Sequence, residues 1–290
     1  MEKDITSGKP LSLWHNRDYL LLWLGQAVSS LGTGISQLAF PLLILAFTHS
    51  PAAAGFAAAL QRIPYLLFSL PAGALVDRWD RKHIMIVCTA GLALSLASIP
   101  VALNSGYLTI IQIYLVSFII GTFGVFYELA ILSSIAHVVT KAQLPTAVLQ
   151  NEAVYSTVSL LAPSLSGFLY SAGRLFPFVA DAISYLALLG ALFGIRSPLQ
   201  GKREGVKHHL LTEIREGIQW LWSHRTIFSL AFLSGYLYVV ENGSVLIVVV
   251  IAQQHHVPTS IIGVIFAIGG VGNITGTLLS APIQRRIRFG

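Results

Sequence analysis

The stretch YLLLWLGQAVSSLGTGISQLAFPLLILAF, residues 19–47, contains no charged side chain. A helix of roughly 20 apolar residues is long enough to cross a hydrocarbon core of about 30 Å, so this stretch predicts a transmembrane helix. Seven further apolar segments follow it. The eight predicted spans are Tyr19–Phe47, Ala52–Val76, Ile84–Leu103, Tyr107–Ala136, Ala153–Ser171, Leu175–Ile195, Ile227–Ile251 and Ile261–Ile283. The sequence therefore predicts an all-α polytopic membrane protein.

Lysine and arginine fall almost entirely on one side of these spans. Of the 18 basic residues, all but Arg62 and Arg174 lie in the N-terminal tail, in the second, fourth and sixth gaps between spans, or after the last span. Arg174 lies in a gap on the opposite side, and Arg62 lies inside a span. Basic residues concentrate in cytoplasmic loops. We therefore predict a multi-pass protein of the cell membrane with both termini in the cytoplasm.

The composition also indicates which partners to expect. Hydrophobic residues make up 54% of the chain and charged residues only 10%, against about 25% charged in ordinary soluble domains. The net charge of +6 resides in short loops, where topology and anionic lipid headgroups explain it. We therefore expect the lipid bilayer as a partner and no binding to nucleic acid.

The side chains that carry enzyme chemistry are scattered in this sequence. No Gly-rich phosphate loop, Ser-His-Asp arrangement or clustered pair of carboxylates is present. Cys88 is the single cysteine, and no Cys/His spacing typical of zinc occurs. The pairs at 208–209 and 255–256 are adjacent histidines, which do not share one face of a helix. We predict no enzymatic activity, no cofactor and no metal site.

The spans divide the chain into three parts. Residues 1–195 are predicted to form a six-helix transmembrane bundle, and residues 227–290 to hold the first two helices of a second bundle. Residues 196–226 form a polar linker. Apolar residues at positions 210, 211, 214, 218, 221 and 222 make a helical stripe in it, which predicts an amphipathic helix lying along the membrane surface.

An internal repeat appears at an offset of 208 residues. Arg17 before the first span matches Arg225 before the seventh, and Gly55 matches Gly263 near the start of the second and eighth. Two halves in parallel orientation are typical of some secondary transporters. A second half of six spans would extend beyond Gly290, so we interpret the chain as truncated after its eighth span.

The loop between the second and third spans reads GALVDRWDRK, residues 73–82. It resembles the signature loop of the major facilitator superfamily, Gly-x-x-x-Asp-Arg-x-Gly-Arg-Lys/Arg, with an Asp at position 80 in place of the second Gly. The resemblance implies that Asp77 meets a helix N-terminus of the other half and that the basic residues bind carboxylates or lipid headgroups. The residues that match the pattern are Gly73, Asp77, Arg78, Arg81 and Lys82.

Further motifs narrow the resemblance. The opening NRDYLLLWLGQ, residues 16–26, is similar to the start of the drug and siderophore exporters of this superfamily, the macrolide-efflux and enterobactin-exporter branch. The stretches at 143–147, 162–167, 180–185 and 213–217 match the same branch in order and spacing. The resemblance implies a major facilitator-like bundle that works by alternating access. Members usually have twelve spans, and the last four are absent here.

Charged residues inside spans are costly and are therefore hypotheses for function. Glu241 in the seventh span is a candidate proton carrier, or else forms a structural pair or attracts cations. Glu128 in the fourth span, beside two aromatic residues, could receive a lipophilic cation, or its aromatic neighbours could simply pack against lipid. Arg62 could attract an anionic substrate or form an ion pair. Asp181 in the sixth span is expected to be structural.

We therefore predict a secondary active transporter that exports a small amphiphilic compound of the drug or siderophore class. Protons would return in the opposite direction, carried by Glu241 and by Glu128. Without a nucleotide-binding motif, the drive would come from an ion gradient or a separate partner. The alternative is a truncated membrane protein that does not transport, or a fragment that acts through a partner.

Overall fold

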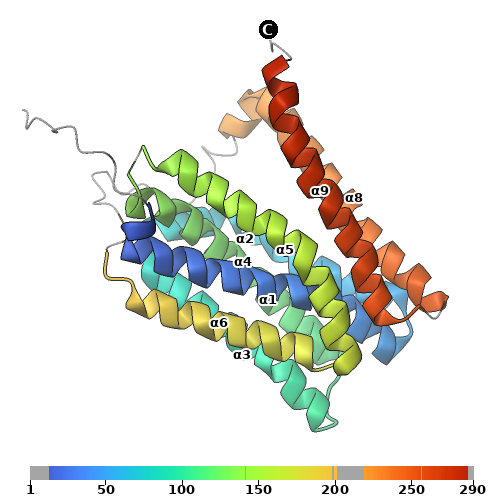
Figure 1. Cartoon of the computed structure of the whole chain (residues 1–290). Coiled ribbons are helices and arrows are strands. Elements are labelled where there is room, and N and C mark those ends of the chain that lie inside the picture. Colours follow the sequence, from blue (N-terminus) through green and yellow to red (C-terminus); the bar gives the residue numbers. More distant parts are fainter. Residues whose placement is uncertain (1–12, 141, 198, 201–218, 256, 287–290) are drawn as a thin grey trace, which may run out of the picture.

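The structure is a computed structural model that describes residues 13–140, 142–197, 199–200, 219–255 and 257–286 of the 290-residue chain, without the side chains of 136, 238–239, 241–242 and 273–286. Throughout these residues the named elements are helices (Figure 1). They are η1 (Leu13–His15), α1 (Arg17–Thr48), α2 (Pro51–Arg78), α3 (Arg81–Asn104), α4 (Ile110–Val138), α5 (Leu144–Ala172), α6 (Phe176–Gly194), α8 (Arg225–Gln254) and α9 (Thr259–Arg286).

Short polar side chains set the starts of the first four long helices. Asn16 accepts a hydrogen bond from the backbone amide of Tyr19, and Ser50 does the same for Ala53 at the start of α2. Thr109 caps α4. Such caps satisfy amides that have no partner inside the helix. Asp80, which departs from the pattern of the signature loop, caps α3 by accepting from the amide of His83 at 2.7 Å.

The eight long helices correspond one to one with the eight predicted spans. The largest difference is at α5, which begins at Leu144 and not at Ala153. Pro145 stands in its first turn, where a missing amide costs nothing. The long apolar run begins only after the polar residues at 150–152. Because the span was placed by hydropathy, it leaves out the first turns of the helix. The helix therefore extends beyond the N-terminal end of the predicted span.

The first six helices form one bundle. Around it, α5 packs on α1, α1 on α6, α6 on α3, α3 on α4 and α4 on α2, and α2 returns to α1 (Figure 1). Leucine and isoleucine side chains from α1, α3 and α6 fill the core; Leu43, Leu92 and Leu188 are almost wholly buried. The helices α1 to α6 thus pack on one another as one bundle, while the division of the chain at residue 195 stays a prediction.

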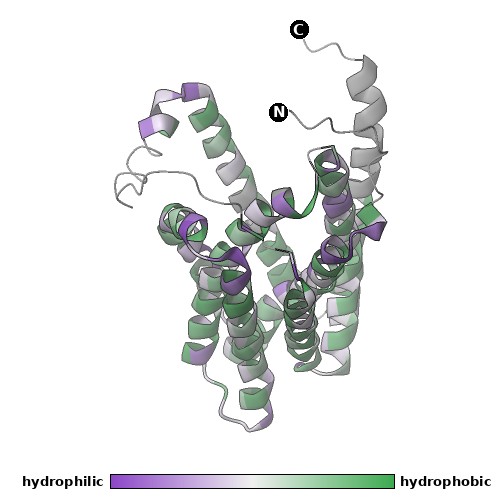
Figure 2. Ribbon diagram, turned by 90° about the vertical axis from the view of Figure 1, so that its left-hand side faces the viewer, coloured by the Kyte–Doolittle hydropathy of each residue, from purple (hydrophilic) through white to green (hydrophobic). Residues whose placement is uncertain are grey.

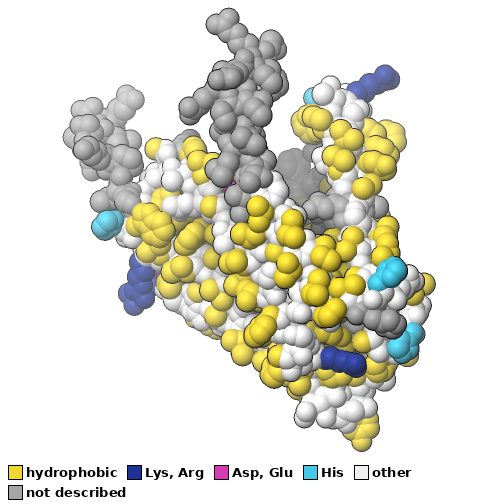
Figure 3. Space-filling model, turned by 45° about the vertical axis from the view of Figure 1, so that its right-hand side comes forward, with side chains coloured by type: hydrophobic (Ala, Val, Ile, Leu, Met, Phe, Trp, Pro, Cys, Tyr) yellow, Lys and Arg dark blue, Asp and Glu magenta, His cyan; other side chains and the backbone are white. Residues whose placement is uncertain are grey.

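Hydrophobic residues dominate the helices, while hydrophilic residues gather at the helix ends and in the loops (Figure 2). Hydrophobic side chains also cover much of the outer face in Figure 3. Five helices, α1, α2, α3, α4 and α6, are long and apolar enough to cross a membrane. In α8 and α9 the described residues leave shorter apolar stretches, Gly243–Gln254 and Thr259–Gly272.

The last two helices begin at the sequence positions that the predicted repeat indicates. Arg225 and Thr259, the first residues of α8 and α9, stand 208 positions after Arg17 and Pro51, the first residues of α1 and α2. Helix α9 packs along α5, and α8 touches α1 and α2 (Figure 1). Residues 219–223 of the linker are helical, whereas the rest of the predicted surface helix lies outside the described residues.

Candidate functional site

Three polar side chains meet between α2 and α4, and we call them the α2–α4 cluster: Arg62, Tyr65 and Glu128. The Tyr65 hydroxyl donates a hydrogen bond to Glu128 Oε1 at 2.8 Å. The guanidinium carbon of Arg62 lies 5.7 Å from the centroid of the Tyr65 ring, within the range of a cation–π interaction. Arg62 also attracts the Glu128 carboxylate.

The local sequence explains this meeting. Arg62 and Tyr65 are three residues apart on α2, so they share one face of that helix. Helices α2 and α4 approach closely because Gly121 has no side chain: a Cβ there would overlap the carbonyl of Gln61. Glu128 then lies beside Tyr65. Glu128 is the most exposed of the three residues, whereas Arg62 and Tyr65 are half-buried.

Asp181 lies in a different, enclosed environment. It is 1% exposed and accepts hydrogen bonds from Ser36 of α1 and from Ser184 one turn along α6. We call these three residues the Asp181 network. It joins the two helices, as expected for a structural role, and its role remains an interpretation. Arg174, seven residues away, forms no ion pair with Asp181 among the described contacts.

Glu241 falls within α8, but its side chain lies outside the described residues. Its proposed part in proton transfer stays a prediction. Among the residues that the structure does describe, no group of three or more His, Cys, Asp or Glu side chains is placed to hold a metal ion.

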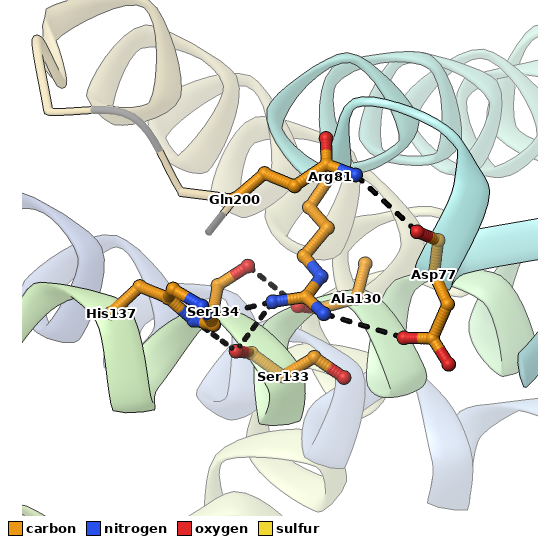
Figure 4. Close-up of polar contacts among 7 residues, drawn as sticks. All are labelled: Asp77, Arg81, Ala130, Ser133, Ser134, His137 and Gln200. Atoms are coloured by element: carbon orange, nitrogen blue, oxygen red, sulfur yellow. Dashed lines mark hydrogen bonds and ion pairs between the residues drawn. The ribbon is translucent and has the colours of Figure 1, made fainter. Parts of the chain in front are cut away.

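The loop of residues 73–82 forms a compact set of polar contacts (Figure 4). Arg81 pairs with Asp77 at 3.3 Å and donates to the Ser133 carbonyl of α4 at 3.0 Å. Its Nη1 also lies 3.2 Å from His137 Nδ1. Lys82 Nζ donates to the Ile195 carbonyl at 2.7 Å. These basic side chains thus bind backbone carbonyls of the same bundle.

Asp77 itself is 60% exposed at its side chain, and its carbonyl accepts from Gln200 Nε2 at 3.4 Å. The resemblance implied a contact between Asp77 and a helix of the other half; among the described residues, the polar contacts of Asp77 are with Arg81 and Gln200. Arg78 is half-buried, and Gly73 has open space where a Cβ would stand.

This arrangement can be compared with known proteins. The family described as "transmembrane secretion effector", a branch of the major facilitator superfamily, matches residues 9–289. The chain belongs to this family. Its family and fold are those of transporters and not of enzymes, and it is a multi-pass membrane protein.

Several relatives of this family member are exporters. It is 28% identical to macrolide efflux protein A of Streptococcus pyogenes over 230 residues, which cover 76% of the chain and 55% of the relative. It is 22% identical to the enterobactin exporter EntS of Citrobacter koseri over 93% of the chain and 64% of the relative. The chain thus spans about half to two thirds of the length of these relatives.

A solved structure shares the fold. It is a bacterial homologue of the human lysosomal transporter Spinster in an inward-facing, unoccupied conformation, with a TM-score of 0.70 and 18% sequence identity. The match covers 94% of this chain and 64% of that chain. The predicted fold class and the predicted resemblance to exporters are both confirmed.

Sequence reasoning missed a polar stripe along α1 in this family member. Gln26 accepts from the Tyr127 hydroxyl of α4, and its amide contacts Ser30 at 3.3 Å. Thr33 lies 2.9 Å from the Tyr185 hydroxyl of α6. The spacing of four and three residues between positions 26, 30 and 33 is the signal that could have revealed one helix face.

The same stripe borders a pocket between α1, α4 and α5. The pocket is lined by Tyr19, Leu22, Trp23, Gln26, Ile131, Ile135 and Asn151. It adds polar groups to the interior of the bundle beyond those of the α2–α4 cluster.

Proposed function

We propose that this protein is a secondary active exporter that moves a small amphiphilic compound across the cell membrane by alternating access. The proposal draws on relatives that bear the names of macrolide, enterobactin and multidrug exporters. The observation that carries it is the α2–α4 cluster. An exposed carboxylate within a membrane-spanning bundle is costly and is retained where it binds something.

The chemistry of the cluster suits a compound with an apolar body and one charged group. A cation would bind the Glu128 carboxylate and lie against the Tyr65 ring, taking the place that Arg62 now holds. An anion would bind Arg62 instead. Because the two charged side chains already attract each other, the empty site costs less than two isolated charges would.

We further propose that protons drive export. Glu241 and Glu128 would each bind a proton in one state of the cycle and release it in the other. The distribution of basic residues supports an orientation with both termini in the cytoplasm. The substrate would then leave toward the side that bears the short loops.

The first experiment is an efflux measurement in a bacterium that lacks its own drug exporters. Two products are expressed: the 290-residue chain, and the product of its gene read beyond Gly290 wherever the frame continues. Cells are loaded with radiolabelled erythromycin, a macrolide cation, or with enterobactin, an anion. Retained label is followed with and without a protonophore. Protonophore-sensitive efflux of either compound supports the proposal.

The matched variants are Glu128→Gln and Glu152→Gln. Both remove one acid of the N-terminal bundle, but Glu152 lies in the first turns of α5, away from the cluster. Losing a hydrogen bond to a charged group costs about 1.5–3 kcal/mol, so Glu128→Gln should weaken erythromycin efflux by roughly 10- to 100-fold while Glu152→Gln leaves it intact. Equal efflux in both variants would remove the cluster from substrate binding. No efflux from either product would favour the non-transporting alternative.

A further inference from the structure

The last turn of α4 carries a histidine that touches the signature loop. His137 is exposed to solvent, and its Nδ1 lies 3.2 Å from Arg81 Nη1 and 3.0 Å from the carbonyl of Ser133 (Figure 4). Arg81 Nη1 also donates to that same carbonyl at 3.0 Å. The Arg81 side chain is only 12% exposed. We call Asp77, Arg81, Ser133 and His137 the Arg81 latch.

The donors and acceptors of this latch permit two arrangements. A guanidinium has five N–H donors and no acceptor, so Arg81 can hydrogen-bond His137 only where Nδ1 offers its lone pair. The ring is then neutral and carries its proton on Nε2. Arg81 meanwhile holds the Ser133 carbonyl, which ties the start of α3 to the end of α4.

Protonation of His137 reverses these contacts. Nδ1 then carries a hydrogen and donates to the Ser133 carbonyl, one helical turn earlier on its own helix. Arg81 loses the Nδ1 acceptor and faces a second positive charge at contact distance. Its remaining ionic partner is Asp77, 3.3 Å away at the end of α2 and 60% exposed. Protonation therefore weakens the hold of α4 on Arg81 and leaves the existing pair with Asp77 of α2 as its main contact.

Other charged groups near this end of the bundle are bound elsewhere or exposed. Lys82 donates to the Ile195 carbonyl, and Asp80 caps α3. Where the start of α1 meets the end of α4, Asn16 donates to the Val138 carbonyl, and Asp18 accepts from Arg196 and Ser197. Arg78 on α2 is half-buried. Three further groups, His15, Arg17 and His83, are exposed, and Lys141 lies outside the described residues. Arg81 thus remains the charged group in direct contact with His137.

We propose that His137 is a proton-operated catch on the signature loop: its neutral ring helps to hold Arg81 against α4, and its protonated ring releases Arg81 from α4 and leaves it paired with Asp77 alone. Histidine is the side chain that ordinarily changes charge between about pH 5 and 8. The exposed ring samples the solution at this end, which the basic residues predict to be the cytoplasm. Acidification there would loosen the contact between α3 and α4. This proposal concerns regulation and does not depend on the identity of the substrate.

The test measures the conformation of the signature loop by the fluorescence of a probe attached to it. Trp79, the residue directly after α2, is 57% exposed; it is replaced by Cys in a Cys88→Ala background and labelled with bimane. The full chain is purified in lipid nanodiscs, and the emission spectrum is recorded from pH 5.5 to 8.0. We expect the ratio of the two emitting states to change about 1.4- to fivefold, the range for one exposed charged contact.

Three variants decide the outcome. His137→Gln keeps an acceptor at every pH and should abolish the change, while His137→Arg cannot accept and should give the acidic spectrum throughout. His83→Gln removes another exposed histidine near the signature loop and should titrate like the parent. A flat parent profile, an unchanged titration in His137→Gln, or loss of the response in His83→Gln would each overturn the proposal. Size-exclusion profiles confirm that every variant is folded.

Discussion

The contact between α1 and α6 provides the sharpest test of the packing. Gly32 of α1 lies directly against the Asp181 network. A Cβ built on Gly32 would stand 2.7 Å from Ser184 Cβ and 2.8 Å from Asp181 Oδ1, and closer still to Ser184 Oγ. Optimal contact between carbon atoms is about 3.5–4.0 Å. Gly32→Ala must therefore push the two helices apart by roughly 1 Å or displace Ser184.

Neither adjustment is easy. Ser184 Oγ is held by the Asp181 carbonyl at 2.7 Å and lies near Asp181 Oδ1 at 3.3 Å. Overpacking a core costs about 1–3 kcal/mol, and a buried polar group that loses its partner costs about 1–3 kcal/mol more. Alanine in place of glycine inside a helix returns about 1 kcal/mol. The net loss is about 1–5 kcal/mol.

Thermal stability measures this loss. One kcal/mol shifts the melting temperature of a chain of 150–250 residues by about 2–4 °C, so a loss of about 1–5 kcal/mol should lower the melting temperature of Gly32→Ala by about 2–20 °C. The assay heats a detergent-solubilised fluorescent fusion and follows the monodisperse peak by size exclusion. Gly190→Ala on α6 is the control, because a Cβ there meets no atom within 4 Å. Equal melting temperatures for the two variants would refute the close contact.

Two further predictions concern the acids of α6 and α8. Ser36→Ala removes a hydroxyl that donates to Asp181, a loss of about 1–2 kcal/mol. In the same thermal assay it should lower the melting temperature by roughly 2–8 °C. The control is Ser98→Ala, which should change the melting temperature little because the Ser98 hydroxyl donates to a carbonyl of its own helix. Glu241→Gln should leave the protein in the membrane but abolish the protonophore-sensitive part of erythromycin efflux, whereas Glu152→Gln should retain it. Proton-linked efflux that persists in Glu241→Gln would remove this residue from the coupling.

The helices could be predicted well from the sequence because a helix in lipid must be apolar along a continuous stretch of the chain. Each span must be apolar along most of its length, and that property does not depend on which helix packs against which. The difference at α5 has the same origin. Its first turns, from Leu144 to Glu152, are helical, but polar residues at 150–152 separate them from the long apolar run, so hydropathy indicates which part of a helix is apolar and not where the helix begins.

The candidate sites were less predictable because they depend on helix rotation and pairing. Arg62 and Glu128 could be found singly, since charge inside a span is rare. Tyr65, which joins them, carries no such signal. Likewise, nothing in the last turn of α4 shows that His137 would reach Arg81, because that contact arises from the packing of α4 against α3.

The α2–α4 cluster and the Arg81 latch share the same helices. Helix α4 carries Glu128 and, nine residues on, His137; helix α2 carries Tyr65 and, twelve residues on, Asp77. At 1.5 Å per residue these pairs lie about 14 Å and about 18 Å apart along their helices. Rigid helices are among the elements that carry coupling between sites, although Pro71 interrupts the hydrogen bonds of α2 between Tyr65 and Asp77. A ligand that separates α2 from α4 at the cluster will therefore also change the geometry at the latch, and the latch in turn will bias the cluster, because coupling between two sites is reciprocal.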